Sequence, residues 1–378
     1  MGAMRNVRAA AVVAASLTAI ALFGSSCSTD PNSEAGPVAG DGGLDTGTAD
    51  TGAPAEGGGL DTGTPDPGDG GPVAANCAPA GDGRTNCGSA SESCCTTLPV
   101  TGGTFSRSYD GINYTDPQYG ATVADFRLDK YEVTVGRFRA FVGAVVGGWT
   151  PPPGSGKHAH VNGGSGLAAS GLPGGNEPGW DTAWNTTLPS SAATWDSPAY
   201  LACNPASTWT PAPASNERRP INCIDWYQAL AFCIWDGGFL PSEAEWNYAA
   251  AGGSEQRAYP WSSAYPPGSS TISAANAVYG GGAAITEDVG SKSPAGNGRY
   301  GQTDLAGNVW EWALDWYKTP YNETSCTNCA HLVAGSFRVI RGGSLSNDTF
   351  SLTASLRYGD DAPTVRYADV GARCARTP

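Results

Sequence analysis

The chain has 378 residues, a formal net charge of −14 and eleven cysteines. An acidic chain of this kind presents no basic field for nucleic acid, so nucleic acid is excluded as an expected partner. The number of cysteines favours an oxidising compartment, in which cysteines pair as disulfides.

The N-terminus has the form of an export signal. Arg5 and Arg8 precede an apolar run over residues 9–23, and small residues then lead to Cys27. The run is too short to span a bilayer, so residues 1–26 are predicted to be a secretory signal peptide. A cysteine after small residues resembles a bacterial lipoprotein cleavage site. It implies lipid on Cys27 and a chain anchored to the outer membrane or cell surface, with simple secretion as the alternative.

Residues 27–76 are predicted to be a lipidated, disordered acidic tether. Residues 30–76 contain nine Asp or Glu and no Lys or Arg, and the tether has no aromatic residue. Such a segment cannot bury enough apolar surface to offset the entropy of ordering. The stretch at 42–50 also returns in nearly the same form at 58–66.

Residues 77–97 are predicted to form a small cysteine-rich cap. Adjacent cysteines are poorly placed to pair with each other, so Cys94 and Cys95 are expected to reach different partners. Removing Cys27 leaves an even number of cysteines that can pair completely, although the sequence does not give their connectivity. They are Cys77, Cys87, Cys94, Cys95, Cys203, Cys223, Cys233, Cys326, Cys329 and Cys374.

Cys326 and Cys329 have the spacing of half a zinc knuckle or of a redox pair. A second Cys-x-x-Cys and a nearby histidine pair are both missing from the sequence. A structural disulfide is therefore the favoured interpretation.

Three helices are predicted from capping signals and apolar periodicity. Residues 134–146 place their apolar side chains on one stripe, with Thr134 as N-cap. Asp225 is predicted to cap a helix over residues 226–235, which ends before two glycines. A Ser-x-x-Glu capping box starts a third helix within residues 242–251.

The rest of the predicted main domain, residues 98–378, is rich in Gly, Pro, Trp and Tyr. Residues 150–220 are expected to be surface loops pinned by buried aromatic side chains. His158 and His160 lie in this stretch, and His331 is the third histidine of the chain. The sequence therefore offers no second cluster to complete a three-histidine metal site and no obvious general base.

Five short motifs follow one another along this domain. They are residues 129–134 (Asp-Lys-Tyr-Glu-Val-Thr), 240–246 (Leu-Pro-Ser-Glu-Ala-Glu-Trp), 305–312 (Leu-Ala-Gly-Asn-Val-Trp-Glu-Trp), 341–344 (Arg-Gly-Gly-Ser) and 370–374 (Val-Gly-Ala-Arg-Cys). In this order they resemble the formylglycine-generating enzymes, also called sulfatase-modifying factors. The resemblance implies an α+β, C-type-lectin-like fold with low secondary-structure content.

The resemblance also implies a structural calcium ion. Carried over by position, its ligands are a side-chain oxygen of Asp304, the carbonyl oxygens of Gly307 and Val309, and the carboxylate of Glu311. Mixed carboxylate and carbonyl oxygens are what Ca²⁺ prefers. The alternative is that Glu311 is buried against an arginine such as Arg341 and that no ion is bound.

The oxidases of this family bind copper(I) with two thiolates shortly after the Arg-Gly-Gly-Ser motif. At the matching positions this chain has Asn347 and Leu352. Neither residue can replace a thiolate toward a soft ion, so copper is not expected as a cofactor. The expected function is therefore a peptide- or glycan-binding accessory module. The alternative is a formylglycine-generating oxidase acting on sulfatase-type cysteine substrates.

Relatives on this scaffold that act as binding proteins use the segment after Arg-Gly-Gly-Ser as their recognition surface. Carried over to this chain, the candidate ligand groove is formed by a mixed set of polar and aromatic residues. They are Arg341, Asn347, Asp348, Thr349, Phe350, Arg357 and Tyr358. The alternative is that Arg341 and Arg357 are structural ion-pair partners.

Overall fold

The computed structural model of the chain describes residue 77 and residues 81–378, except 267, 270 and 282–284. The chain divides into two compact units, and every described residue lies in the second of them, Pro67–Pro378. The predicted signal peptide and lipidated tether, including Cys27, lie outside the described residues. Within the described part, no helix is both long enough and apolar enough to cross a membrane.

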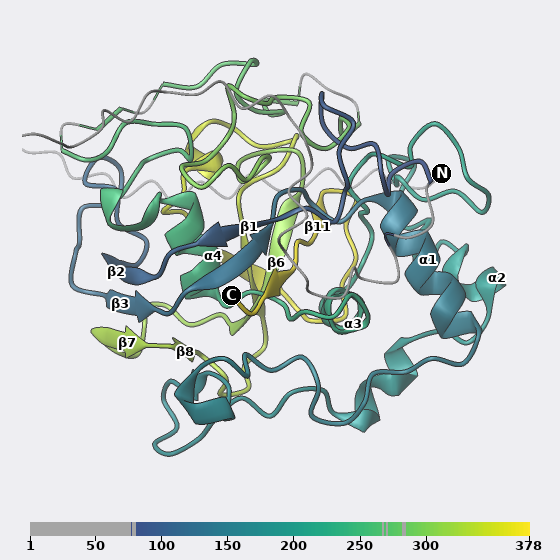
Figure 1. Cartoon of the computed structure of the whole chain (residues 1–378), viewed down its shortest axis with the longest axis horizontal. Coiled ribbons are helices and arrows are strands. Elements are labelled where there is room, and N and C mark those ends of the chain that lie inside the picture. The colour runs from purple at the N-terminus through teal and green to yellow at the C-terminus, as the bar shows by residue number, and fades with distance from the viewer. Residues whose placement is uncertain (1–76, 78–80, 267, 270, 282–284) are drawn as a thin grey trace, which may run out of the picture. The chain divides into compact units, whose positions relative to one another are not determined.

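Short strands and helices separated by ordered coil build this unit (Figure 1). The strands are β1 (Thr97–Val100), β2 (Gly103–Ser106), β3 (Gly120–Val123), β4 (Phe126–Asp129), β5 (Ala168–Ala169), β6 (Trp310–Trp316), β7 (Ser325–Thr327), β8 (Cys329–Ala330), β9 (Arg338–Arg341), β10 (Tyr358–Asp361), β11 (Val370–Gly371) and β12 (Ala375–Arg376). The α-helices are α1 (Val135–Val146), α2 (Ala192–Trp195), α3 (Trp226–Trp235) and α4 (Glu243–Ala250). The 3-10 helices are η1 (Asn162–Gly164), η2 (Thr182–Thr187), η3 (Gly253–Glu255) and η4 (Phe350–Leu352).

A four-stranded sheet in the order β10-β9-β6-β11 brings the later family motifs together. Strand β6 is antiparallel to β9, with Glu311 opposite Arg341, and parallel to β11. Three smaller sheets, β1-β4-β12, β2-β3-β7 and β5-β8, complete the described pairing. The predicted mixture of few helices and short, mixed sheets is confirmed.

The three predicted helices are present with the predicted caps. Thr134 accepts a hydrogen bond from the backbone of Arg137 and starts α1. Asp225 starts α3 with a capping box, and Ser242 and Glu245 form the capping box of α4. A capping box satisfies amide groups at a helix start that have no partner inside the helix, which is why such short patterns locate helices well.

Helices α1 and α3 pack their aromatic faces against each other. Phe138 and Phe141 of α1 both contact Phe232 of α3, with ring centroids 5.7 Å apart in each pair. Trp195 of α2 lies against the two α1 rings and is fully buried. This cluster is part of the largest apolar core of the described residues.

The ten predicted cysteines all form disulfides, as expected. Cys94 and Cys95 reach different partners, and Cys326 pairs with Cys329, which confirms the structural interpretation of that motif. The five bonds are Cys77–Cys95, Cys87–Cys94, Cys203–Cys223, Cys233–Cys374 and Cys326–Cys329.

The cysteine-rich segment packs directly on the main domain. The hydroxyl of Thr134 donates to the carbonyl of Gly83, and Arg137 donates to the carbonyl of Cys94 at 3.1 Å. The segment then continues into β1, which pairs with β4. Residues 150–220 run mostly as coil and are anchored by buried tryptophans, as predicted.

Candidate functional site

Two arginines of the predicted groove converge on Glu243, the first residue of α4. Arg341 Nη2 lies 2.8 Å from Glu243 Oε1, and Arg357 Nη2 lies 2.6 Å from Glu243 Oε2. Burial alone would raise the pKa of Glu243, but the positive charges of Arg357 and Arg341 hold it below its ordinary value. The alternative stated above, that both arginines are structural ion-pair partners, is what the structure shows.

Arg341 is fully buried and also holds the chain that follows it. Its Nη1 donates to the carbonyl oxygens of Ala354, Ser355 and Leu356 at 3.3, 3.3 and 2.8 Å. A side chain committed in this way has no surface to offer a ligand. The prediction that Arg341 lines a ligand groove is therefore wrong, because the carboxylate of Glu243, distant in sequence, draws it into the interior.

The other predicted groove residues divide into turn-forming and exposed side chains. Asn347 accepts hydrogen bonds from the backbone and hydroxyl of Ser344 at 2.9 and 2.7 Å. Asp348 is exposed, and its Oδ1 accepts hydrogen bonds from the backbone amide and the hydroxyl of Ser351 at 3.0 and 2.9 Å. Phe350 and Tyr358 are also exposed, and the Phe350 ring stacks on Tyr114 with centroids 5.7 Å apart. Thr349 is exposed as well. Asp348, Phe350 and Tyr358 are here called the exposed motif surface.

The two positions that correspond to the family's thiolates differ in their environment. Leu352 is fully buried and packs with Tyr259, Ala277 and Ala306 in a small apolar cluster. Asn347 is engaged in the turn described above. Every cysteine in the part of the chain that the structure describes is disulfide-bonded, so this part offers no free thiol.

The carboxylate of Glu311 is committed to protein partners. Arg373 Nη2 lies 2.6 Å from Oε1 and Arg373 Nε lies 2.7 Å from Oε2, and Trp246 Nε1 also donates to Oε2 at 2.7 Å. The expected arginine partner of Glu311 was one such as Arg341, whereas the partner is Arg373 of the last family motif. This ion pair joins β6 to the segment that follows β11.

The other predicted calcium ligands lie along the same loop. Asp304 is buried, and its Oδ2 accepts hydrogen bonds from the backbone of Gly290 at 2.6 Å and the hydroxyl of Thr303 at 2.8 Å. Gly307 has a φ of 86° and donates its amide to Gly342. Burial raises the pKa of Asp304, although two hydrogen bonds and Arg373 oppose that rise.

A residue that the sequence analysis did not single out holds this loop. Glu132, of the first family motif, accepts hydrogen bonds from Asn308 Nδ2 at 2.7 Å and from the Val309 amide at 3.2 Å. Burial raises its pKa well above the ordinary value, and the carboxylates of Asp304 and Glu311 raise it further. A glutamate beside a Thr-capped helix gave no sequence signal that it would face a loop so distant in the chain.

The charges around this loop bear on the calcium prediction in two opposite ways. Three buried carboxylates beside one guanidinium leave an excess of negative charge, which suits a cation. However, the guanidinium of Arg373 pairs with both oxygens of Glu311, one of the predicted calcium ligands. Calcium at Asp304, Gly307, Val309 and Glu311 therefore stays a prediction, and no chemical step is derived from it.

Elsewhere in the described residues, three side chains that could bind a metal have ligand atoms within 4.8 Å of one another. They are those of Asp129, Asp236 and Cys374. Both carboxylates pair with Arg137, and the sulfur of Cys374 is in a disulfide. The group is therefore a structural ion-pair cluster.

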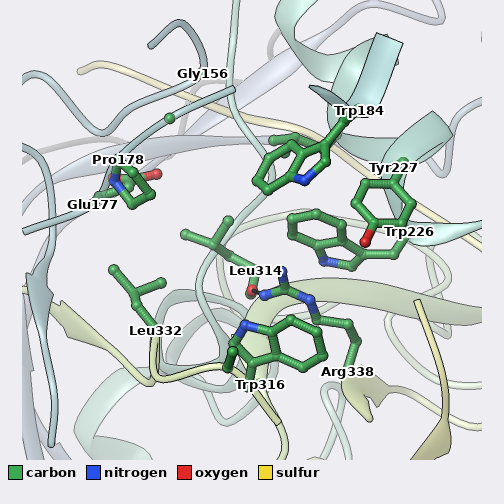
Figure 2. A pocket seen from close by; sticks show the side chains of 13 residues that line it. Gly156, Glu177, Pro178, Trp184, Trp226, Tyr227, Leu314, Trp316, Leu332 and Arg338 are labelled. Carbon is green, nitrogen blue, oxygen red and sulfur yellow. Dashed lines mark hydrogen bonds between the residues drawn. The ribbon is translucent and has the colours of Figure 1, made fainter. Parts of the chain in front are cut away.

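An aromatic cavity of about 340 Å³ lies between α3, β6, β9 and the 150–190 loops (Figure 2). Trp184, Tyr227 and Trp316 are half-buried at its edge, and Trp226 and Leu314 are buried in its wall. The lining residues are Gly156, Glu177, Pro178, Gly179, Trp184, Trp226, Tyr227, Leu230, Leu314, Trp316, Leu332, Ala334 and Arg338. The sequence analysis missed this cavity, because four distant segments contribute its walls.

Arg338 lies in this cavity between two indole rings (Figure 2). Its guanidinium carbon is 3.5 Å from the ring centroid of Trp226 and 3.7 Å from that of Trp316. Nη1 donates to the carbonyl of Leu314 at 2.6 Å. Burial lowers the pKa of Arg338 to about 9, against the weak opposing influence of Tyr227 and Asp315.

His158 joins the cavity wall to α4. Its Nδ1 lies 3.0 Å from Glu177 Oε2 and its Nε2 lies 2.9 Å from Glu245 Oε2, and the ring is fully buried. Burial alone would lower the pKa of His158, but the two carboxylates raise it to about 10. His158 is therefore a charged structural link, and Glu177 is not free to pair with Arg338.

A family profile described as the sulfatase-modifying factor enzyme 1-like domain (FGE-sulfatase) matches residues 84–378. The chain belongs to this family. The match confirms the fold expected from the five motifs, and it begins inside the segment that was predicted to be a separate cap.

Individual members of the FGE-sulfatase family are similar to this chain over different lengths. The formylglycine-generating enzyme of Thermomonospora curvata is 29% identical over 273 residues, which cover 68% of this chain and 83% of that enzyme. The hercynine oxygenase of Mycolicibacterium smegmatis is 34% identical over 173 residues, covering 41% of this chain and 37% of that protein. The solved structure of PvdO from Pseudomonas aeruginosa covers 75% of this chain and 94% of its own, with 22% identity and a TM-score of 0.48.

Proposed function

We propose that this chain is a member of the FGE-sulfatase family that binds a peptide or glycan and does not generate formylglycine. The observation that carries the proposal is the chemistry at the two positions of the family's thiolates. Asn347 offers an amide that already caps a turn, and Leu352 offers a buried hydrocarbon. Neither group binds copper(I), which selects soft thiolate ligands.

The disulfides support the same proposal. A replacement copper site would need two free thiols, and the cysteines late in the domain are Cys326, Cys329 and Cys374. These three are paired in disulfides, as are all other cysteines of the described residues. A disulfide sulfur carries no thiolate charge, so it does not replace the missing ligands.

Recognition is proposed to use the exposed motif surface. Asp348 supplies an acceptor, and Phe350 and Tyr358 supply exposed aromatic faces. Arg341 and Arg357 act as structural residues, because both pair with Glu243. Exposed aromatic and polar side chains on a rigid base are typical of protein and glycan contact surfaces.

The localisation belongs to the same proposal. Five disulfides form in an exported chain and not in a reducing cytosol, which supports the predicted signal peptide. Lipid on Cys27 would anchor the domain to a membrane. Metabolic labelling with a fatty acid should mark the wild type and not Cys27→Ser, and a label that survives this substitution would rule out the anchor.

The second candidate function is oxidation of a cysteine in a sulfatase-type substrate. The names of the relatives favour it, because several of them are called formylglycine-generating enzymes. Incubating the copper-treated chain in air with a sulfatase-type cysteine peptide, beside the Thermomonospora enzyme as a positive control, decides between the two. We expect the peptide mass to stay unchanged with this chain, and conversion of its thiol to an aldehyde would overturn the binding proposal.

A further inference from the structure

We propose that the aromatic cavity binds a small organic anion with a flat apolar body, such as an aromatic carboxylate, and that Arg338 is its anion-binding group. The site lies outside the exposed motif surface and shares no residue with it. The inference does not depend on whether the chain oxidises cysteine. It rests on the charge of Arg338, which is unpaired within the described residues, and on the residues that form the walls of the cavity.

Arg338 has no carboxylate partner among the described residues. Three arginines that are 0% exposed, Arg137, Arg341 and Arg373, each form an ion pair with an Asp or Glu. Arg107, which is 5% exposed, forms none of the described ion pairs but donates to two backbone carbonyls, those of Tyr119 and Glu323. Arg338 is 4% exposed, yet it forms no ion pair within the described part of the chain, and its one hydrogen bond goes to Leu314. Its Nε is buried without a partner. A buried charge without a counter-charge is costly, which a bound anion would relieve.

Three carboxylates of the described residues lie around Arg338, and none of them forms an ion pair with it. Asp361 stands opposite Arg338 in the β9–β10 pairing and has an interaction of its own. Glu177 lines the cavity, but both its oxygens lie within hydrogen-bond distance of the charged ring of His158. Asp315 accepts the backbone amides of Glu243 at 2.7 Å and of His331 at 2.7 Å, and it forms no ion pair with Arg338. The anion must therefore come from outside the described residues.

The walls of the cavity suit a ligand with a flat, apolar body. Four aromatic rings, those of Trp184, Trp226, Tyr227 and Trp316, line one side of the cavity, and Pro178 and Leu332 lie across from them (Figure 2). Flat apolar groups stack well on such rings, and about 340 Å³ is within the usual range for a small-molecule site. An organic cation would also suit aromatic walls, but the guanidinium of Arg338 would repel it.

The test compares two probes of the same shape, indole-3-acetate and indole-3-acetamide, by isothermal titration calorimetry with the mature chain. The carboxylate can pair with the guanidinium, whereas the neutral amide cannot, so we expect the amide to bind about tenfold more weakly. In Arg338→Met this preference should disappear. Arg139→Met is the matched control, because Arg139 stacks 4.3 Å from the ring of Trp209 but pairs with Glu217.

A second variant keeps the test decisive if Arg338→Met does not fold, which near-ultraviolet circular dichroism would show. Trp184→Ala removes a half-buried wall residue and should weaken both probes while keeping the preference for the acid. Equal affinities of the wild type for the two probes would overturn the proposal, as would no binding of either. A preference for the acid that survives in folded Arg338→Met would also overturn it.

Discussion

Strand β9 carries a buried arginine at each end, and the two have opposite surroundings. Arg341 pairs with Glu243, and its two Nη groups donate to carbonyl and hydroxyl oxygens as well. Arg338 lies between two indole rings and has one carbonyl partner. The Nε of each lacks a hydrogen bond, so the difference lies in the carboxylate.

This difference separates a structural arginine from one that is available to a ligand. Burial is nearly the same for both side chains, so burial alone does not reveal the role. Where a carboxylate such as Glu243 is buried as well, the pair cannot be broken without stranding a charge. Where the described part of the chain provides no carboxylate, as at Arg338, the counter-charge can come from a ligand.

The largest expected effect is on stability, and it compares the two arginines directly. Arg341→Met leaves the buried Glu243 with Arg357 alone and should lower the free energy of unfolding by roughly 3 to 5 kcal/mol. Arg338→Met strands no carboxylate, so loss of its stacking should cost only about 1 kcal/mol. Urea titration of both variants measures this. Equal losses would mean that Arg338 is as structural as Arg341.

The next largest effect is expected at His158, whose ion pairs with Glu177 and Glu245 hold the cavity wall to α4. Its pKa is about 10 instead of 6.5, so its ion pairs stabilise the fold fully below about pH 6.5, and that contribution is lost as the pH rises through about 10. His158→Gln should cost about 3 kcal/mol near neutral pH and should flatten this alkaline dependence. Unfolding titrations across this range test it, and a variant with an unchanged pH profile would contradict the assignment.

A smaller effect is expected at Glu311. Its ion pair with Arg373 and its predicted role as a calcium ligand lead to different results when calcium is removed. Glu311→Gln should cost about 2 kcal/mol in calcium and in chelator alike, because Gln keeps part of the hydrogen bonding to Arg373. Thermal melts of both proteins in the two media measure it. Calcium present at a hundred times its dissociation constant would add about 2.7 kcal/mol to the free energy of unfolding. A loss of that size on chelation, seen in the wild type and not in Glu311→Gln, would support calcium at Asp304, Gly307, Val309 and Glu311.

The smallest effect is expected at the exposed motif surface. Phe350→Ala removes an exposed ring stacked on Tyr114 and should cost less than about 1 kcal/mol. It should also leave the acid-over-amide preference of the cavity unchanged, because Phe350 does not line the cavity. Calorimetry with the two indole probes checks this. A changed preference would show that the two surfaces are coupled.

The local features of this protein could be predicted from its sequence. Thr134, Asp225 and Ser242 were predicted as helix caps and are caps, because a cap depends on residues a few positions apart. The Cys326–Cys329 disulfide and the membership of the FGE-sulfatase family could be predicted for a similar reason. Each is indicated by motifs that are only a few residues long. The sequence also shows directly that the two positions of the family's thiolates are occupied by Asn347 and Leu352.

Only the tertiary structure decided which charges meet. Glu311 pairs with Arg373 and Glu243 pairs with Arg341, and in each pair the partners are far apart in sequence. Their choice depends on strand pairing and on which groups become buried together, which no local pattern encodes. The same holds for the cavity around Arg338, because its walls come from separate segments that meet only when the core forms. The sequence thus determined the elements and their caps, and packing determined that Arg338 has no carboxylate partner among the described residues.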